Sequence, residues 1–325
     1  MGTIAVSPFA RMAGILGEPR RHPFGWSGKV SIMRLSIWPS ASQPYTGILE
    51  VARHAADTGW DGVYVADHFM PNLPIGQRPD KPMLEAGSLA AALGAAIPRV
   101  RIGTLVYGNT YRHPAVLANM AATVDHITGG RFVFGVGAGW QVNEHHQYGI
   151  ELPPVKRLLD RFVEALQVWH GLLRTPTTDF TGEYYQLTGA VCEPKPVQDP
   201  LPILIGAKGE KRMLKVVAEY ADLWNTWGLP DTIAHKSRVL DEHCATVGRD
   251  PRAIGRTAQA LVVVDGPLPR NLPVPVYGGS ASEIARTVEA YRAIGLDELI
   301  VPDGLLGTGA ERLKALDTIQ AVVRS

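Results

Sequence analysis

The chain has 325 residues, of which 46% are hydrophobic and 19% are charged, and its formal net charge at pH 7 is +1. This length accommodates one large α/β domain or two smaller ones with a sizeable core. The near-neutral charge gives no bulk electrostatic reason to expect nucleic-acid or membrane binding. The only cysteines, Cys192 and Cys244, argue against a disulfide framework and a cysteine-rich metal site.

The first strand-like run begins at Met33, so residues 1–32 are expected to be an N-terminal extension and residues 33–325 a single domain. The extension has no compact apolar stretch before a small-residue cleavage site, so we do not expect a signal peptide. No apolar run in the chain reaches the ~18 residues of a membrane span. These features predict a cytoplasmic protein.

From Met33 onward, eight short apolar runs alternate with eight helical patterns. The runs are rich in Val, Ile and Leu without strict alternation, which is typical of buried parallel strands. The predicted strands are residues 33–38, 62–66, 101–107, 132–136, 203–206, 223–226, 258–264 and 298–301. The predicted helices are residues 46–58, 84–97, 115–127, 157–173, 210–220, 232–247, 283–294 and 310–323. Eight βα units favour a (β/α)₈ TIM barrel, with a doubly wound parallel sheet as the alternative.

Three connecting segments exceed the usual length of ~2–6 residues. Residues 70–82 follow the second strand and residues 265–280 follow the seventh. Both therefore belong to the carboxyl ends of the strands, where lids and specificity loops lie. Residues 175–201 precede the fifth strand and contain FTGEYYQLTG, which predicts a small hairpin.

Glycine-rich segments follow the third, fourth and fifth predicted strands: Gly108-Asn109-Thr110, Gly135–Gly139 and Gly206-Ala207-Lys208-Gly209. Glycines let backbone amides approach an anion, and Lys208, Lys211 and Arg212 add positive charge at the third segment. Each segment alone is a weak signal. Together, at neighbouring strand ends, they predict a phosphate-bearing cofactor. Neither Gly135–Gly139 nor the fifth-strand turn follows the Rossmann pattern, because neither has an acidic ribose partner ~20 residues on.

Asp67 and His68 end the second strand. A histidine titrates near neutral pH, and this position is catalytic in many barrels. We expect Asp67 to favour the protonated imidazole of His68 or to fix its tautomer. The alternative is a histidine that makes one structural hydrogen bond. The ends of the first, fifth and sixth strands carry no histidine, so no metal site is predicted.

Four tryptophans lie at or near strand ends: Trp38, Trp140, Trp224 and Trp227. Packing in the core is the simple interpretation, and it is favoured for Trp224. The other three could form an apolar wall against a flat ring or a substrate.

Four separated motifs, VADHFMP, GTLVYGNTYRHPAVLANMAATVDHITGGRFVFGVGAGWQVNE, EPKPVQDPLPILIGAKGEKRMLKVVAEYADLWNTWG and YGGSASEIARTVEAYRAIGLDELIVP, resemble the bacterial luciferase-like monooxygenase superfamily. The family fold is a (β/α)₈ barrel. Some members use reduced FMN and oxygen, often with a separate flavin reductase, and others use the deazaflavin coenzyme F420 (8-hydroxy-5-deazaflavin) for hydride transfer. The Asp-His pair, the third-strand segment and the fifth-strand turn resemble the F420 branch.

The resemblance implies roles for particular residues. His68 would lie beside the reactive ring carbon. Leu105-Val106 would form a bulge, often with a non-proline cis peptide, that backs the ring. The cofactor surface would comprise Leu105, Val106, Gly108, Asn109, Gly137, Ala138, Gly139, Trp140, Asn143, Gly206, Ala207, Lys208 and Gly209. Sugar-phosphate dehydrogenases of this branch have a glutamate where this chain has Trp140, which argues against that activity.

The resulting expectation is an F420-dependent oxidoreductase that transfers a hydride to or from a small apolar or carbonyl-bearing substrate, with Trp38, Trp140 and Trp227 at the substrate. An FMN-dependent monooxygenase and a flavin-binding barrel without catalysis remain the alternatives. A homodimer is left open, and neither nucleic acid nor a membrane is an expected partner.

Overall fold

The computed structural model describes residues 33–325, so the expected extension, residues 1–32, lies outside the described residues. The strands are β1 (Arg34–Trp38), β2 (Gly62–Val65), β3 (Arg101–Thr104), β4 (Tyr107–Gly108), β5 (Phe132–Gly137), β6 (Thr178–Thr181), β7 (Gln186–Ala190), β8 (Ile203–Gly206), β9 (Leu223–Trp227), β10 (Gly255–Gln259), β11 (Leu261–Val264), β12 (Val276–Gly279) and β13 (Glu298–Pro302). The α-helices are α2 (Tyr45–Asp57), α3 (Ala86–Ala96), α4 (Pro114–Thr128), α5 (Val142–Tyr148), α6 (Val155–Arg174), α7 (Met213–Tyr220), α8 (Pro230–Val247), α9 (Ala281–Ala293) and α10 (Gly309–Arg324).

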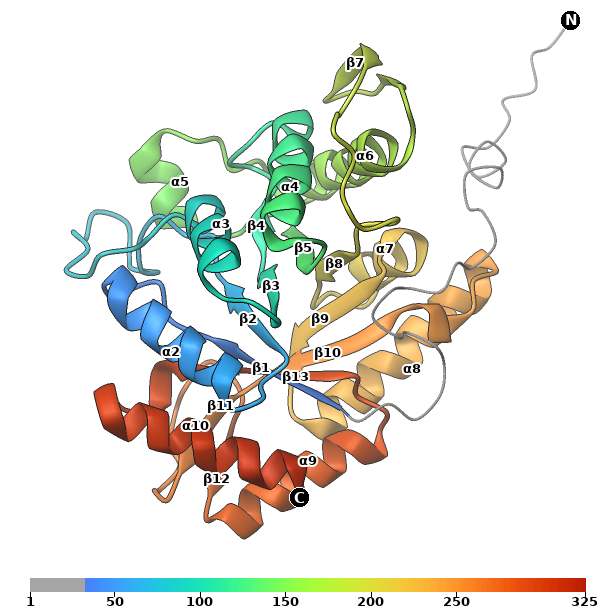
Figure 1. The fold of residues 1–325 in the computed structure, drawn as a ribbon. Coiled ribbons are helices and arrows are strands. Elements are labelled where there is room, and N and C mark those ends of the chain that lie inside the picture. The colour runs from blue at the N-terminus through green and yellow to red at the C-terminus, as the bar shows by residue number, and fades with distance from the viewer. Residues whose placement is uncertain (1–32) are drawn as a thin grey trace, which may run out of the picture.

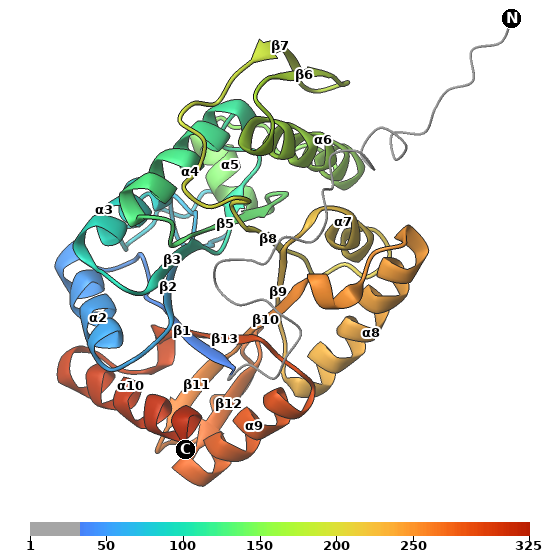
Figure 2. The ribbon, with the colours of Figure 1, turned by 45° about the vertical axis from the view of Figure 1, so that its right-hand side comes forward.

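Nine strands form one parallel sheet in the order β3-β2-β1-β13-β10-β9-β8-β5-β4, and an additional β3–β5 pairing closes it into a barrel. Because β3 and β4 are two pieces of the third barrel strand, the barrel has eight strand positions. Helices surround it on the outside (Figures 1 and 2). The (β/α)₈ prediction is confirmed, and closure excludes the doubly wound alternative.

The inside of the barrel is filled below its carboxyl-terminal mouth. At the amino ends of the strands, fully buried Glu298 accepts hydrogen bonds from Arg101 (2.6 Å) and Ser36 (2.5 Å). An apolar layer lies above, and it consists of Tyr64, Leu105, Val133, Leu204, Leu223 and Ile300. A ligand therefore has room only at the carboxyl ends of the strands, as in other barrels of this kind.

The seventh strand differs from its prediction. Residues 258–264 were expected to form one strand, but the barrel strand is β10, which ends at Gln259. The next segment, β11, leaves the barrel and pairs in parallel with β12. The polar residues Arg256 and Thr257 concealed the start of β10. Their partners, Asp241 and Asn225, come from α8 and β9.

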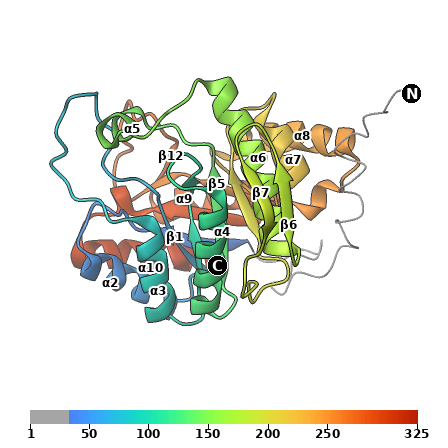
Figure 3. The same ribbon diagram turned by 90° about the horizontal axis from the view of Figure 1, so that it is seen from above.

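Two other differences lie near strand ends. The helix predicted over residues 210–220 begins only at Met213, after a turn. Residues 142–148, for which no helix was predicted, form the short helix α5, which Gly149 ends with a positive φ of 67°. Figure 3 shows α5 beside the long loop that follows β2.

The hairpin predicted before the fifth barrel strand is present, because β6 and β7 pair in antiparallel fashion. Its turn is held by Glu164 of α6, whose carboxylate accepts hydrogen bonds from the backbone N–H groups of Glu183, Tyr184 and Tyr185. In residues 33–325, none of the helices combines the length and apolar character needed to cross a bilayer.

Candidate active site

The third barrel strand is interrupted at Leu105-Val106, where the peptide bond is cis, as the family resemblance predicted. Leu105 joins the apolar layer inside the barrel, and half-buried Val106 packs on top of that layer. A Cβ on Gly137 would lie 2.7 Å from Val106 Cγ2, and one on Gly206 would lie 3.2 Å from Val106. The missing side chains at the ends of β5 and β8 thus leave room for the side chain of Val106, and we call Val106 and these two glycines the glycine cradle.

The loop after β5 also requires glycine. Gly139 has a φ of 97°, and its Cβ would lie 2.7 Å from Thr110 Oγ1. A residue with a side chain would be strained in this conformation and would collide with Thr110. The backbone from Gly137 to Gly139, with Ala138 between, therefore packs closely against the segment that follows β4.

Asn109, expected to contact the cofactor, follows β4, and its buried Oδ1 has no hydrogen-bond partner among the described residues. Its backbone N–H donates to Gly137 O (2.9 Å), which extends the pairing of β4 with β5. Its side chain is buried, and its Nδ2 donates to the hydroxyl of Tyr185 on the hairpin at 3.4 Å. Asn109 therefore holds the strand end in position, and the backbone N–H of Gly108 donates to Asp67.

His68 is held by a carboxylate that the sequence analysis missed. Its Nδ1 lies 2.8 Å from Glu144 Oε1, and Glu144 Oε2 accepts the backbone N–H of Phe69 at 2.8 Å. The hydroxyl of Tyr111 donates to the same carboxylate. Burial by itself would raise the pKa of Glu144, but the hydrogen bond and charge of His68, with Tyr111 and Phe69, hold it below its usual value. An ionised Glu144 fixes the imidazole proton on Nδ1.

Asp67, expected to act on His68, is committed elsewhere. Its carboxylate accepts the backbone N–H of Gly108 (2.9 Å) and forms a two-point ion pair with Arg112 at 2.7 and 2.9 Å. Arg112 also binds Glu85, the residue that caps α3. Burial raises the pKa of Asp67, and the guanidinium of Arg112 opposes that effect. Asp67 therefore fastens β2 to the interrupted third strand, and the expected contact with His68 was wrong.

The start of α5 clamps the loop that carries His68. Gln141 Nε2 donates to Met70 O at 2.9 Å, and Asn143 Nδ2 donates to Pro71 O at 2.9 Å. Asn143 is 1% exposed, and its Oδ1 has no hydrogen-bond partner among the described residues. Asn143 is therefore a buried acceptor that no described residue satisfies. In the sequence, Gly149 was the one local signal that the helix α5 ends at this point.

The turn after β8 is fixed from two sides. Trp224, fully buried, donates its indole N–H to Ala207 O at 2.9 Å. Lys236 of α8 donates to Lys208 O (2.9 Å) and to Glu210 Oε1 (2.7 Å). The core interpretation of Trp224 is thus supported, and the backbone of this turn is rigid.

The positive charge expected at this turn is smaller than the sequence indicated. Arg212 forms an ion pair with Asp160 of α6. Lys208, Gly209 and Lys211 are exposed, and neither lysine has an ion pair in residues 33–325. The turn thus offers two free ammonium groups and bare backbone to an anionic tail.

The remaining tryptophans line the mouth. Trp38 and Trp227 contact each other with ring centroids 5.8 Å apart. Trp140 meets the ring of His68 edge-on at 5.5 Å and is 58% exposed. Trp140 therefore lies next to the imidazole and open to solvent, where it can contact whatever His68 contacts.

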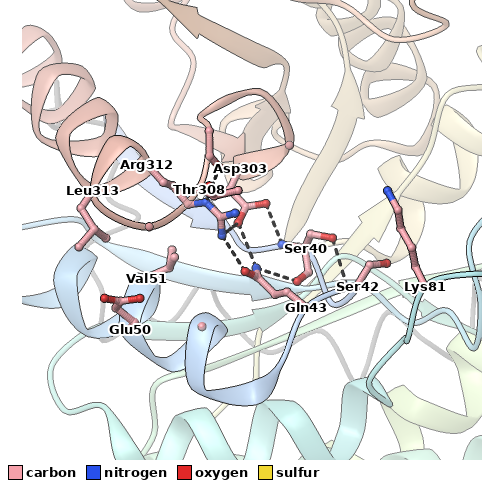
Figure 4. Close-up of a pocket in the computed structure, with 14 residues that line it drawn as sticks. Ser40, Ser42, Gln43, Glu50, Val51, Lys81, Asp303, Thr308, Arg312 and Leu313 are labelled. Carbon is pink, nitrogen blue, oxygen red and sulfur yellow. Dashed lines mark hydrogen bonds and ion pairs between the residues drawn. The ribbon is translucent and has the colours of Figure 1, made fainter.

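A separate cavity of about 560 Å³ lies between the segments that follow β1 and β13. Arg312 pairs with Asp303 at its base, and Asp303 also accepts the backbone N–H of Ser40 (Figure 4). None of the residues predicted for the site lines this cavity. Its buried carboxylate is already paired, so these contacts hold the two segments together beside Trp38.

The sequence profile of the luciferase-like monooxygenase family matches residues 28–267. The chain belongs to this family. An uncharacterized protein of Mycobacterium tuberculosis is 31% identical over 215 residues, which are 61% of this chain and 74% of that protein. The F420-dependent glucose-6-phosphate dehydrogenase of Amycolatopsis mediterranei is 34% identical over 175 residues, or 54% of this chain and 50% of that enzyme. The match thus spans about half of that relative's length.

Among solved structures, an F420-dependent secondary alcohol dehydrogenase in complex with an F420-acetone adduct superposes on this chain with a TM-score of 0.78. The superposition covers 90% of this chain and 98% of that one, at 22% sequence identity. At this identity the likeness establishes the shared barrel fold.

Proposed function

We propose that this luciferase-like enzyme is an F420-dependent oxidoreductase that transfers a hydride between the deazaflavin and a small organic substrate. The observation that carries the proposal is the cradle formed by Gly137 and Gly206 over Val106, one strand away from His68. It presents the side chain of Val106 on backbone that carries no side chains of its own, and Glu144 orients the imidazole of His68. The similarity to F420-dependent relatives supports the same cofactor.

Bound deazaflavin would supply or accept the hydride at its ring carbon. Val106 and Leu105 would back the ring. The segment from Gly137 to Asn143 would hold the side chain of the cofactor, and the turn from Gly206 to Gly209 would hold its phosphate. Because Glu144 occupies Nδ1 of His68, Nε2 is the nitrogen that remains to orient the substrate or to move a proton.

An FMN-dependent monooxygenase is the second candidate, because FMN offers a similar flat ring to the same cradle. The free ammonium groups of Lys208 and Lys211 favour the deazaflavin, whose tail carries more negative charge. Titration of both cofactors at one salt concentration, followed by tryptophan quenching, should show tighter deazaflavin binding that weakens as salt rises. Equal or tighter FMN binding, with oxygen consumption by the reduced complex, would support the monooxygenase.

The role of His68 is tested by His68→Asn. We expect turnover to fall by ~10²–10⁴-fold with little change in deazaflavin affinity, because a proton carrier acts in the transition state. The matched control is His146→Asn, since His146 is exposed on α5. Loss of cofactor affinity along with rate would make His68 a cofactor contact. Binding without turnover of any carbonyl substrate by the wild-type protein would support a non-catalytic barrel.

A further inference from the structure

The turn that follows β8 contains two peptide groups whose carbonyls are held from the helix layer. Trp224 donates its indole N–H to Ala207 O at 2.9 Å, and the ammonium group of Lys236 donates to Lys208 O at 2.9 Å. The Trp224 side chain packs in the core that the strands share with the surrounding helices. Lys236 lies on α8, which packs beside α7 (Figure 2). Both carbonyls therefore point toward the helices.

The direction of each carbonyl fixes the direction of the next backbone N–H. In a planar trans peptide, the C=O of one residue and the N–H of the following residue point to opposite sides. The bonds Ala207-Lys208 and Lys208-Gly209 are both trans. The N–H groups of Lys208 and Gly209 therefore point away from the helices. Both residues are exposed, and neither N–H donates to another group within residues 33–325.

Lys236 is unusually buried for a lysine, since its side chain is 11% exposed. A buried ammonium group is costly unless it is paired. Besides Lys208 O, its partner is Glu210 Oε1 at 2.7 Å. The same carboxylate lies 3.4 Å from His235 Nε2, so it is drawn toward α8. Lys236 thus directs its donors at the turn itself, and its effect on a ligand would pass through the backbone that it holds.

Two successive N–H groups that point to the same side form a concavity that favours an anion. The exposed ammonium groups of Lys208 and Lys211, which have no ion pair in the described part of the chain, add positive charge beside it. Gly209 has wide backbone freedom, so the peptide group that precedes it can rotate unless its carbonyl is held. The hydrogen bond from Lys236 supplies this restraint.

We propose that Lys236 is a positioning residue for the phosphate group of the cofactor. It holds Lys208 O and thereby aims the N–H of Gly209 at a phosphate oxygen, without touching the phosphate itself. The inference rests on the proposed function, since the phosphate belongs to the cofactor of the same site. It assigns a role in cofactor binding to a residue of α8, a helix that contributes none of the predicted site residues.

The test compares two deazaflavins by fluorescence titration of the full-length protein. One is coenzyme F420, and the other is its phosphate-free form, which keeps the ring and the ribityl chain. We expect Lys236→Met, which keeps the apolar stem and removes the donor, to weaken F420 binding ~10-fold. Binding of the phosphate-free form should not change. Lys236→Arg keeps both donor and charge and should restore most of the affinity for F420.

The matched control for charge is Lys211→Met, because Lys211 is an exposed cation of the same turn. Its effect on F420 binding should fade at high salt, since exposed charges are screened. The effect of Lys236→Met should persist at high salt, because salt does not restore the orientation of a peptide group.

Equal weakening of both deazaflavins by Lys236→Met would overturn the positioning role and make Lys236 a structural residue. An effect that fades with salt, as in Lys211→Met, would reduce Lys236 to a source of charge. If F420 binds equally well to Lys236→Met and wild type, the positioning role falls and the proposed function stands. If FMN binds more tightly than F420, and Lys236→Met weakens FMN but not riboflavin, the positioning role stands and the proposed function falls.

Discussion

The two sides of the barrel mouth are built from opposite kinds of residue. At the ends of β5 and β8, Gly137 and Gly206 have no side chains, and the side chain of Val106 packs against both. At the ends of β1 and β9, Trp38 and Trp227 fill the space with the largest side chains available. The glycine side can accept a rigid ring. The tryptophan side can only limit the size and shape of a molecule beside that ring.

Under the proposed function, this difference would separate the cofactor from the substrate. Bare backbone on neighbouring strands suits a cofactor that is the same in every turnover. Large side chains can be exchanged without disturbing that surface, so they suit the substrate side. His68 lies at the end of β2, between β1 and the interrupted third strand, where the two sides meet.

The largest expected effect comes from filling the glycine side. In Gly137→Ala the new Cβ would lie 2.7 Å from Val106 Cγ2, and the branched Val106 side chain has little freedom to rotate away. Val106 is then pushed into the ring site, and deazaflavin affinity should fall by about 3 kcal/mol. Fluorescence titration measures the change. The control is Gly304→Ala, whose Cβ would meet only an ordinary contact at 3.8 Å; equal affinities in both variants would contradict the cradle.

Glu144→Gln should show whether the structure around His68, where the two sides meet, depends on the charge of the Glu144 carboxylate. The lowered pKa of Glu144 means that its ionised form stabilises the protein above about pH 4.5, and that this contribution is lost as pH falls through the lowered value. The variant should lose about 2 kcal/mol of unfolding free energy at pH 7. This difference should shrink toward pH 3.

Denaturant unfolding at both pH values gives the comparison for Glu144→Gln, and exposed Glu50→Gln is the control. A pH-independent difference between wild type and Glu144→Gln would mean that packing, and not the carboxylate charge, stabilises this position.

Lys208→Ala tests whether the glycine side binds the charged tail of the cofactor in addition to its ring. Removing an exposed ammonium group that contacts the cofactor tail should weaken deazaflavin binding by about 1–2 kcal/mol at low salt. The loss should diminish at high salt, because the contact is ionic. Lys314→Ala, on α10, is the control. Unchanged affinity would place Lys208 in solvent.

The smallest effect is expected from Trp140, which stands between the two sides next to His68. Trp140→Ala should raise the KM for an apolar carbonyl substrate by a factor corresponding to about 1 kcal/mol. Unfolding free energy should change little, because the side chain is 58% exposed. A fall in deazaflavin affinity with unchanged KM would show that Trp140 contacts the cofactor and not the substrate.

Local patterns were sufficient to predict most of the barrel. Each helix has its own periodicity, and most strands are short apolar runs between turn residues, so these signals do not depend on distant partners. The seventh strand was predicted too late in the chain. Arg256 and Thr257 become suitable strand residues only when Asp241 and Asn225 are beside them. Helix α5 is too short for a periodic signal, and its clamp on residues 69–71 exists only in three dimensions.

The sequence by itself determined the βα alternation and the bare strand ends, because the absence of a side chain is a property of glycine wherever it lies. The tertiary structure decided which carboxylate serves His68. Asp67 is its neighbour in the chain, but consecutive residues at a strand end point in different directions, and Asp67 binds Arg112 instead. Glu144, 76 positions away, reaches His68 because α5 folds back over the loop that follows β2.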